Sequence, residues 1–440
     1  MNPDKKLSCC DPLTGLPGRA QALAHIAELR ERRADFAVLH FDLDQFGRLN
    51  ESLGRALADQ VLAGFAARLQ SCFRSADLIS RVGSDELVAV VAGIREPEAA
   101  GWIAEHAQEV LSQLLVAGAQ EVFVTASLGV ALSSAAGGPE ELAQRAATAL
   151  ASARQGGRAG CVLYEEAMRQ RAAAQLKLET DLRLALDRGE LSVHYQPIVN
   201  LRSGQISGFE ALARWHHPVR GPVPPADFIP VAEQTGLIVP LGAWVLRSAA
   251  CQLAAWRNGF PDLVEPLWMS VNVSERQLDE PMVHAVERTL GETGLPAHCL
   301  RLELTESTLM RNSQVSRTLA RLKDLGIRLS VDDFGTGYSS LSKLDSLPIE
   351  SIKVDRSFIS RLEPGGVRPE ITAAIVSLGC LLGVEVIAEG IETAVQLQRA
   401  RQLGCHFGQG FFFSRPVPPR VAEALLAGAN RFEPWREEMP

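Results

Sequence analysis

Several features that would assign a protein to a special class are missing from this sequence. No apolar run reaches the roughly 18 residues that a membrane span needs, and the first residues, MNPDKKLSCCDPLTGLPG, lack the apolar core of a signal peptide. Lys and Arg are scattered and the net charge is −8, so no basic patch for nucleic acid is expected. The 8 Cys residues lack metal-finger spacing, which predicts reduced thiols. We therefore expect a cytoplasmic protein without a membrane span or a nucleic-acid partner.

The sequence does have the size and composition of a two-domain globular protein. Its 440 residues are 46% hydrophobic and 22% charged. In the first half, apolar runs alternate with helical patterns, which predicts an α+β sheet with helices on one side. The apolar runs lie at 36–44, 77–93 and 122–132, and the helical patterns at 50–73 and 140–154. The segment 77–93 consists of two apolar runs around Gly-Ser-Asp, which predicts a central hairpin.

The second half repeats a short apolar run, a polar tip and a segment of helical length. The runs are LSVHYQPIV, ISGFEALARW, WMSVNVS, LRLELTES, IRLSVDDF, SIKVDRSF, VEVIAEGIE and HFGQGFFF. Such units predict an α/β barrel of the (β/α)₈ type, whose active site lies at the carboxyl ends of the strands. We expect a first domain over 1–168, a helical linker over 169–188 that leads into the barrel, and the barrel domain over 176–432.

Polar side chains stand at nearly every tip of the predicted barrel strands. They are Gln196, Glu210, Asn272, Glu303, Asp332, Asp333, Lys353, Glu389 and Gln409. A single acid at a strand end is usually a helix cap, but a closed barrel makes these groups converge, and converging carboxylates need counter-ions. Oxygen ligands without His or Cys favour Mg²⁺ or Mn²⁺, and this set can hold two ions ~3.5–4 Å apart. Lys353 could orient the attacking water, and Arg214 offers a fork for a phosphate.

The second half resembles the EAL family of cyclic-di-GMP phosphodiesterases over about residues 176 to 430. The resemblance is carried by FEALARW, VNVS, LELTES, VDDFGTGYSSL, IKVDRSF, IAEGIE and GQGFFFSRP, in one order. It implies a homodimeric enzyme that linearises cyclic di-GMP to pGpG with Mg²⁺ or Mn²⁺. The residues that match the family are Glu210, Asn272, Glu303 and Asp332 for one ion, Asp332, Asp333 and Glu389 for the other, Lys353 for the water, Gln196, Arg214, Gln409 and Asp355 for the substrate, and Glu306 for bracing the loop beside the dimer interface.

The first half resembles the GGDEF family of diguanylate cyclases over about residues 9 to 166, through DPLTGLPGR, FDLDQFGRLN, RVGSDEL and TASLGVA. The matching residues are Asp42 and Asp85 for metal, Glu86 for catalysis, Asn50 and Asp59 for guanine, and Arg154 and Arg158 for phosphate. The departures from the family pattern are Ser84, Leu87, Gly47, Arg55 and Ala58. They predict a degenerate domain that binds GTP as a regulator without making cyclic di-GMP.

Arg74 and Asp77 form an Arg-x-x-Asp pattern six residues before Gly83. This spacing matches the inhibitory cyclic-di-GMP site of the cyclase family, although such a pair is often only a helix-end ion pair. The leading hypothesis is a cyclic-di-GMP phosphodiesterase regulated by its first domain. A non-catalytic receptor and a bifunctional cyclase and phosphodiesterase are the alternatives. Because the first motif begins near the N-terminus, we expect the input to be a nucleotide, a partner protein or the expression level.

Overall fold

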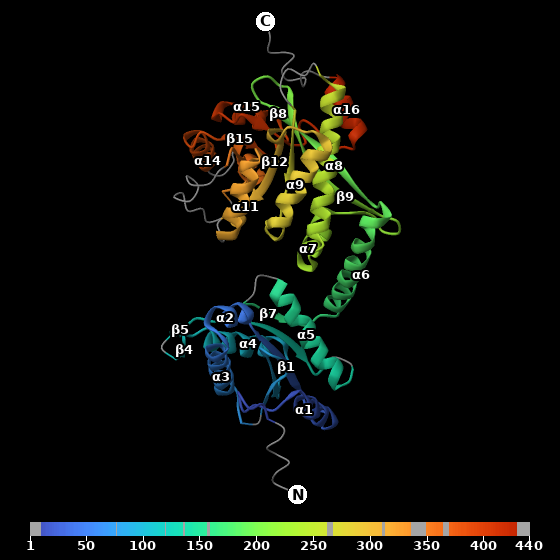
Figure 1. The fold of residues 1–440 in the computed structure, drawn as a ribbon. Coiled ribbons are helices and arrows are strands. Elements are labelled where there is room, and N and C mark those ends of the chain that lie inside the picture. The colour runs from blue at the N-terminus through green and yellow to red at the C-terminus, as the bar shows by residue number, and fades with distance from the viewer. Residues whose placement is uncertain are drawn as a thin grey trace. The chain divides into compact units, whose positions relative to one another are not determined.

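The computed structural model describes residues 10–75, 77–118, 120–134, 137–155, 159–261, 267–309, 313–335, 349–363 and 369–428. The chain divides into two compact units, Met1–Leu176 and Lys177–Pro440. The predicted helical linker at 169–188 lies within α6 (Glu166–Arg188), which begins in the first unit and ends in the second (Figure 1).

The first unit is built on a five-stranded sheet with the order β2-β3-β1-β6-β7. The pairings are antiparallel except that of β6 with β7, which is parallel. The predicted hairpin is present as β2 and β3. The strands are β1 (Phe36–Leu43), β2 (Leu78–Arg81), β3 (Glu86–Ala92), β6 (Ala126–Leu132) and β7 (Cys161–Leu163), and a separate hairpin consists of β4 (Leu115–Ala117) and β5 (Gln120–Val122).

Helices cover both faces of this sheet, so the prediction of helices on one side is wrong. Leu39 and Phe41 of β1 pack in one apolar cluster with α3 and α4, whereas Phe36 and Val38 pack in another with α1 and α5. Successive side chains of a strand point to opposite faces, and all of β1 is buried, which requires cover on both sides. The helices are α1 (Arg19–Glu31), α2 (Phe46–Leu53), α3 (Arg55–Ser71), α4 (Pro97–Leu111) and α5 (Pro139–Gln155).

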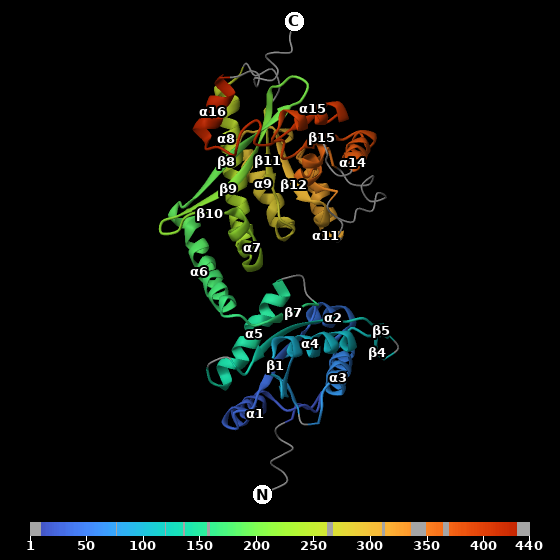
Figure 2. The same cartoon turned by 180° about the vertical axis from the view of Figure 1, so that it is seen from behind.

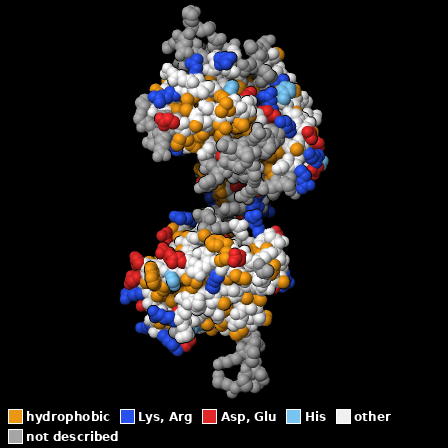
Figure 3. All heavy atoms as spheres, turned by 90° about the vertical axis from the view of Figure 1, so that its left-hand side faces the viewer, with side chains coloured by type: hydrophobic (Ala, Val, Ile, Leu, Met, Phe, Trp, Pro, Cys, Tyr) orange, Lys and Arg blue, Asp and Glu red, His pale blue; other side chains and the backbone are white. Residues whose placement is uncertain are grey.

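The helical pattern predicted over 50–73 is interrupted by a glycine. Gly54 adopts φ 78°, a left-handed conformation that glycine accepts without a steric cost. The segment therefore forms α2 and α3, with Gly54 between them. Figure 3 shows apolar side chains among charges of both signs on one face of the first unit. Val116 of β4 and Phe123, which follows β5, are exposed apolar residues of this unit.

The second unit is a closed barrel (Figure 2). Its nine-stranded sheet has the order β10-β9-β11-β12-β13-β14-β15-β16-β8, and an additional pairing of β8 with β9 closes it. The strands are β8 (Leu191–Asn200), β9 (Ile206–His217), β10 (Gly221–Val223), β11 (Trp268–Asn272), β12 (Leu300–Thr305), β13 (Arg328–Phe334), β14 (Ser351–Val354), β15 (Glu385–Ala388) and β16 (Phe407–Gly408).

The first barrel strand departs from the regular pattern of strand and helix. β8 runs antiparallel to both β9 and β16. Only residues 201–205 separate β8 from β9, and a parallel crossover needs a dozen residues or more. Gln196 consequently reaches the barrel interior from the middle of β8, where it pairs in register with Glu210 of β9.

Helices surround the barrel (Figure 1). One of them, α8, is long and apolar enough to cross a membrane by length and composition, but Leu246, Leu253 and Trp256 on it are buried in the barrel core. The helices are α7 (Pro225–Thr235), α8 (Ile238–Gly259), α9 (Glu280–Thr293), α10 (Glu306–Leu309), α11 (Ser313–Asp324), α13 (Arg356–Ile359), α14 (Pro369–Leu381), α15 (Ala394–Leu403) and α16 (Pro419–Gly428), with the short turns η3 (Glu275–Gln277), η4 (Ala297–Cys299) and η5 (Ser360–Leu362).

Candidate active site

A buried lysine lies at the centre of the polar ring predicted at the strand ends. Lys353 on β14 is 1% exposed. Its Nζ lies 2.6 Å from Glu389 Oε1, 2.8 Å from Glu303 Oε2, 3.4 Å from Asp332 Oδ1 and 3.5 Å from Glu210 Oε2. The barrel thus brings together carboxylates from four strands or strand ends around one ammonium group.

The charges of this ring are not balanced. Burial alone would lower the pKa of Lys353, but the carboxylates around it, led by Asp332, raise it well above its usual value. Burial raises the pKa of Glu303 to about 8 and that of Glu389 well above its usual range. Burial also opposes ionisation of Glu210, but Lys353 and two side-chain amides outweigh it and lower the pKa. One ammonium among these acids leaves negative charge that further cations would offset.

The two adjacent aspartates reach the same site because β13 carries a bulge. Val331 pairs with Ile352 and Phe334 with Val354, so Asp332 and Asp333 together lie opposite one residue of β14. A bulge re-aims side chains that would otherwise alternate between the two faces of the strand. Asp333 has φ 53°, which is uncommon for a residue other than glycine. Its backbone N–H donates to Asp332 Oδ1 at 3.0 Å.

This bulge creates a group of oxygen ligands suited to a metal ion. One carboxylate oxygen each from Asp332, Asp333 and Glu389 lie within 4.8 Å of one another. Burial raises the pKa of Asp333, and the neighbouring Asp332 adds to that shift. Oxygen donors of this kind fit Mg²⁺ or Mn²⁺. Glu303 Oε1 is buried without a hydrogen-bond partner among the described residues, which also leaves it able to bind a cation.

Amide side chains orient the carboxylate of Glu210. Asn272 Nδ2 donates to Glu210 Oε1 at 2.6 Å, and Gln409 Nε2 donates to Glu210 Oε2 at 2.6 Å. Gln409 Nε2 also donates to Gln196 Oε1 at 3.0 Å, and Gln196 Nε2 donates to the carbonyl oxygen of Ser414 at 3.1 Å. The two glutamines predicted to bind substrate therefore contact each other, and Gln409 also contacts the predicted metal ligand Glu210.

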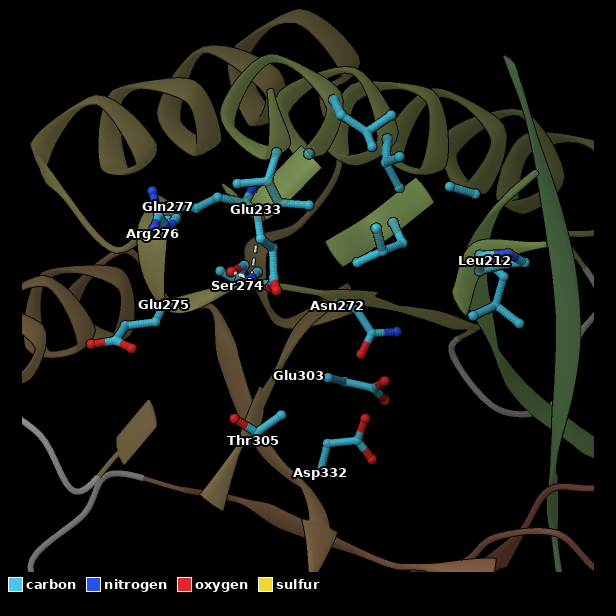
Figure 4. A pocket seen from close by; sticks show the side chains of 18 of the residues that line it. Leu212, Glu233, Asn272, Ser274, Glu275, Arg276, Gln277, Glu303, Thr305 and Asp332 are labelled. Atoms are coloured by element: carbon cyan, nitrogen blue, oxygen red, sulfur yellow. Dashed lines mark hydrogen bonds between the residues drawn. The ribbon is translucent and has the colours of Figure 1, made fainter. Parts of the chain in front are cut away.

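A cavity of about 620 Å³ opens beside the ring. Figure 4 shows the side chains of Asn272, Glu303 and Asp332 converging at its edge. Arg214 also lines this cavity, and its Nη1 donates to the carbonyl oxygen of Ala213 at 2.8 Å. Burial lowers the pKa of this guanidinium, and Glu210 opposes that shift.

Two further predicted residues, Glu306 and Asp355, accept hydrogen bonds from the backbone of the segments that follow β13 and β14. The buried Glu306 accepts a hydrogen bond from the backbone N–H of Gly335 at 3.1 Å, at the start of the loop it is predicted to brace. The rest of that loop, residues 336–348, lies outside the described residues. Asp355 accepts from Ser357 N at 3.0 Å and so caps the short helix α13. Its predicted contact with substrate stays a prediction.

A second group of acids lies in the first unit, at the carboxyl end of β1. Arg154 on α5 donates from Nε to Asp42 Oδ1 at 2.9 Å, and its Nη2 contacts Asp42 Oδ2 and lies 3.3 Å from Glu86 Oε1. Burial raises the pKa of Asp42 to about 6, with Arg154 opposing. His40 Nε2 lies 3.3 Å from Glu86 Oε2 and lowers the pKa of Glu86. A guanidinium thus bridges a predicted metal ligand and its catalytic neighbour.

His40 was missed by the sequence reasoning. It lies two residues before Asp42 on β1, so the two-residue period of a strand places both side chains on the same face. That period is the signal that could have found it.

The remaining predicted residues of the first unit are less tightly grouped. Asn50 lies on α2 and Asp59 on α3, while Ser84 contacts Asp85 in the hairpin loop. Arg158 lies outside the described residues. For the predicted inhibitory pair, Asp77 accepts backbone hydrogen bonds from Arg74 N at 3.0 Å and Ala92 N at 3.2 Å, so its carboxylate organises the turn before β2.

Both units of the chain match the models of known domain families. Residues 179–416 match the EAL domain model, and residues 8–160 match the model of the diguanylate cyclase, GGDEF domain. The chain therefore belongs to the EAL family, in the group whose EAL domain follows a GGDEF domain.

Two curated relatives from Pseudomonas aeruginosa illustrate the similarity. The bifunctional diguanylate cyclase/cyclic di-GMP phosphodiesterase MucR is 40% identical over 96% of this chain and 62% of the relative. The cyclic di-GMP phosphodiesterase NbdA is 37% identical over 98% of this chain and 55% of the relative. The chain thus spans less than two thirds of the length of either relative.

A solved structure matches the barrel. It is described as the PaMucR phosphodiesterase in complex with c-di-GMP, and it is 41% identical with a TM-score of 0.53. The match covers 56% of this chain and 99% of that chain.

Proposed function

We propose that the barrel hydrolyses cyclic di-GMP to linear pGpG with two divalent ions, Mg²⁺ or Mn²⁺. The observation that carries this proposal is the cluster of Asp332, Asp333 and Glu389, whose oxygens lie within 4.8 Å of one another beside Lys353. The names of MucR and NbdA, which are phosphodiesterases for this dinucleotide, support the choice of substrate.

The residues of the ring then have separate tasks. Glu210, Asn272, Glu303 and Asp332 would hold one ion, and Asp332, Asp333 and Glu389 the other. When bound, such ions lower the pKa of water and stabilise the charge on phosphoryl oxygens. Lys353 orients the water that attacks one phosphorus, while the P–O bond to the 3′ oxygen breaks. Arg214 binds a phosphate oxygen, and Gln196 and Gln409 keep Glu210 in position.

The first domain has a regulatory role in this proposal. Arg154 already pairs with Asp42, a predicted metal ligand, and with Glu86, its predicted catalytic neighbour. Ser84 replaces a glycine of the nucleotide loop. We therefore infer that this domain binds GTP without converting it to cyclic di-GMP. The barrel would act as a homodimer through its EAL domain, in the cytoplasm.

Helix α6 provides a connection through which the first domain can act on the barrel. Asp181 on α6 lies 3.2 Å from His217 Nε2 at the end of β9. The backbone N–H groups of Val219 and Arg220 both donate to His217 Nδ1, at 3.1 Å each, and hold the ring in place. Strand β9 also carries Glu210. A change in the position of α6 would therefore be transmitted along β9 to a predicted metal ligand.

A bifunctional enzyme is the second candidate, because MucR is named as both cyclase and phosphodiesterase. It predicts formation of cyclic di-GMP from GTP by the purified chain. The contacts of Arg154 with Asp42 and Glu86 argue against that activity.

The deciding experiment measures hydrolysis of cyclic di-GMP with Mg²⁺ or Mn²⁺, with and without GTP. Glu210→Ala and the nearly isosteric Glu210→Gln are the matched variants. Hydrolysis to pGpG that is lost in both variants supports the proposal, and an effect of GTP supports the regulatory role. Binding without hydrolysis would make the chain a receptor, and new cyclic di-GMP from GTP would make it bifunctional.

A further inference from the structure

The cavity beside the polar ring has two sides of different chemical character. One side carries the ring residues Asn272, Glu303 and Asp332, and the other is formed by α7, α8 and β9. The far side is largely apolar, and its lining includes Leu212, Ile229, Ile238, Leu241 and Val245. A volume of about 620 Å³ is within the range of small-molecule sites, and an apolar wall beside a charged centre suits a flat base attached to a phosphate.

Glu233 of α7 places a carboxylate among the apolar side chains of this part of the cavity. Ser274 Oγ donates to Glu233 Oε1 at 2.6 Å, and Figure 4 shows the two side chains meeting at the cavity wall. Among the described residues, the carboxylates within 3.5 Å of Lys353 Nζ are those of Glu210, Glu303, Asp332 and Glu389, and Glu233 does not belong to this group. Its task is therefore distinct from that of the ring.

A second layer of contacts fixes the orientation of this carboxylate. The backbone N–H of Ser274 donates to Gln277 Oε1 at 3.0 Å, and Gln277 is 4% exposed. Gln277 fits against α8 because position 242 is glycine: a Cβ on Gly242 would lie 1.9 Å from Gln277 Nε2. Glu233 is thus held by Ser274, which is held by Gln277. Such preorganised support is typical of residues that recognise a ligand.

We propose that Glu233 recognises the Watson–Crick edge of one guanine of the substrate. An ionised carboxylate has only hydrogen-bond acceptors. Guanine presents two adjacent donors, N1–H and the exocyclic N2 amino group, whereas adenine presents an acceptor at N1. Glu233 therefore accepts from a guanine and repels an adenine in the same position. This assignment rests on the proposed function, because it takes a cyclic dinucleotide as the substrate.

The test compares cyclic di-GMP with cyclic di-IMP, whose bases keep N1–H but lack the N2 amino group. In the wild-type protein, kcat/KM should favour cyclic di-GMP by about 10- to 100-fold, as expected for a hydrogen bond to a charged group. In Glu233→Gln the KM for cyclic di-GMP should rise by a similar factor with little change in kcat. The preference over cyclic di-IMP should then largely disappear.

Two further variants separate recognition from folding. Glu275→Gln makes the same change on the same cavity wall and should keep the wild-type ratio of the two substrates. Ser274→Ala frees the carboxylate without removing it and should reduce the preference by a smaller factor. If Glu233→Gln fails to fold, Ser274→Ala provides the test. The assignment would be overturned if Glu233→Gln kept the wild-type preference for cyclic di-GMP over cyclic di-IMP, or if Glu275→Gln lost that preference.

Calorimetric affinities for both dinucleotides make the outcome independent of catalysis. If the wild-type protein binds but does not hydrolyse cyclic di-GMP, the proposed function is wrong, and the affinity ratio in Glu233→Gln still decides the role of Glu233. If it hydrolyses both dinucleotides equally well, the assignment of Glu233 is wrong and the proposed function stands. If it neither binds nor hydrolyses them, both are wrong.

Discussion

Replacing Lys353 by methionine should show how far the ring depends on its one ammonium group. The substitution keeps a side chain of similar length and removes the charge that lies within 3.5 Å of four carboxylates. Removing one partner of a buried ion pair costs about 3–5 kcal/mol. For a domain of this size that loss lowers the melting temperature by roughly 6–20 °C.

The loss should depend on pH and on metal. Burial raises the folded-state pKa of Glu303 to about 8, so the buried carboxyl group is neutral at low pH and ionises as the pH rises through 8. The stability that depends on the neutral form is therefore present at low pH and is lost as the pH rises through 8. Lys353→Met in EDTA should therefore be destabilised more at pH 9 than at pH 6. Saturating Mg²⁺ should restore part of the stability, because bound cations replace the lost charge.

Differential scanning calorimetry of the barrel transition, in EDTA and in Mg²⁺, measures these effects. Lys323→Met is the matched control. The Lys323 side chain is 48% exposed and its Nζ lies 3.9 Å from Glu350 Oε1, so the variant should stay within about 0.5 kcal/mol of wild type. Hydrolysis by Lys353→Met should fall by about 10²- to 10⁴-fold. The reasoning is refuted if Lys353→Met is as stable as Lys323→Met in EDTA at pH 9.

Three other substitutions test separate features. Asp42→Asn should stabilise the first domain by up to about 3 kcal/mol at pH 7.5, by about half as much at pH 5 and by little below about pH 3.5, because burial raises the pKa of Asp42 to about 6 and makes its ionised form costly. Asp333→Asn should keep the melting temperature, since asparagine tolerates a positive φ, but lower metal affinity at least about tenfold. Gly129→Ala should cost about 1–3 kcal/mol, because its Cβ would lie 2.1 Å from Leu150 N.

Each of these has a control. Asp333→Ala should lose melting temperature as well as metal affinity, and equal melting temperatures for the Ala and Asn variants would argue against strain at this position. Gly101→Ala, with nothing within 4 Å of the new Cβ, should stabilise α4 by about 0.5–1 kcal/mol. If both glycine variants behave alike, close packing of α5 on β6 is not the cause. For Asp42→Asn, a gain in the stability of the first domain that is independent of pH would contradict the reasoning.

Much of the site follows from the order of residues along the chain. Most of the polar side chains that converge in the barrel lie at or near the carboxyl end of a strand, and closure of a barrel brings strand ends together whatever the details of packing. The carboxylates around Lys353 could therefore be predicted as one group. The alternating apolar and helical segments likewise predicted a first domain with a central sheet and hairpin.

Other features were decided only by the tertiary structure. The cover on both faces of the first sheet depends on which helices pack against β1. The contact of Arg154 with Asp42 joins residues 112 positions apart in the sequence. Residue patterns report the local period of a strand or helix and cannot report such distant contacts.

The adjacent aspartates show most clearly which features the sequence determines and which the folded structure determines. The sequence by itself determined that Asp332 and Asp333 stand at a strand end, but two neighbours on a regular strand point to opposite faces. Only pairing with β14 imposes the extra residue in β13 and the φ of 53° at Asp333. Because a bulge is a property of two strands together, the common site of these carboxylates was decided by the folded barrel.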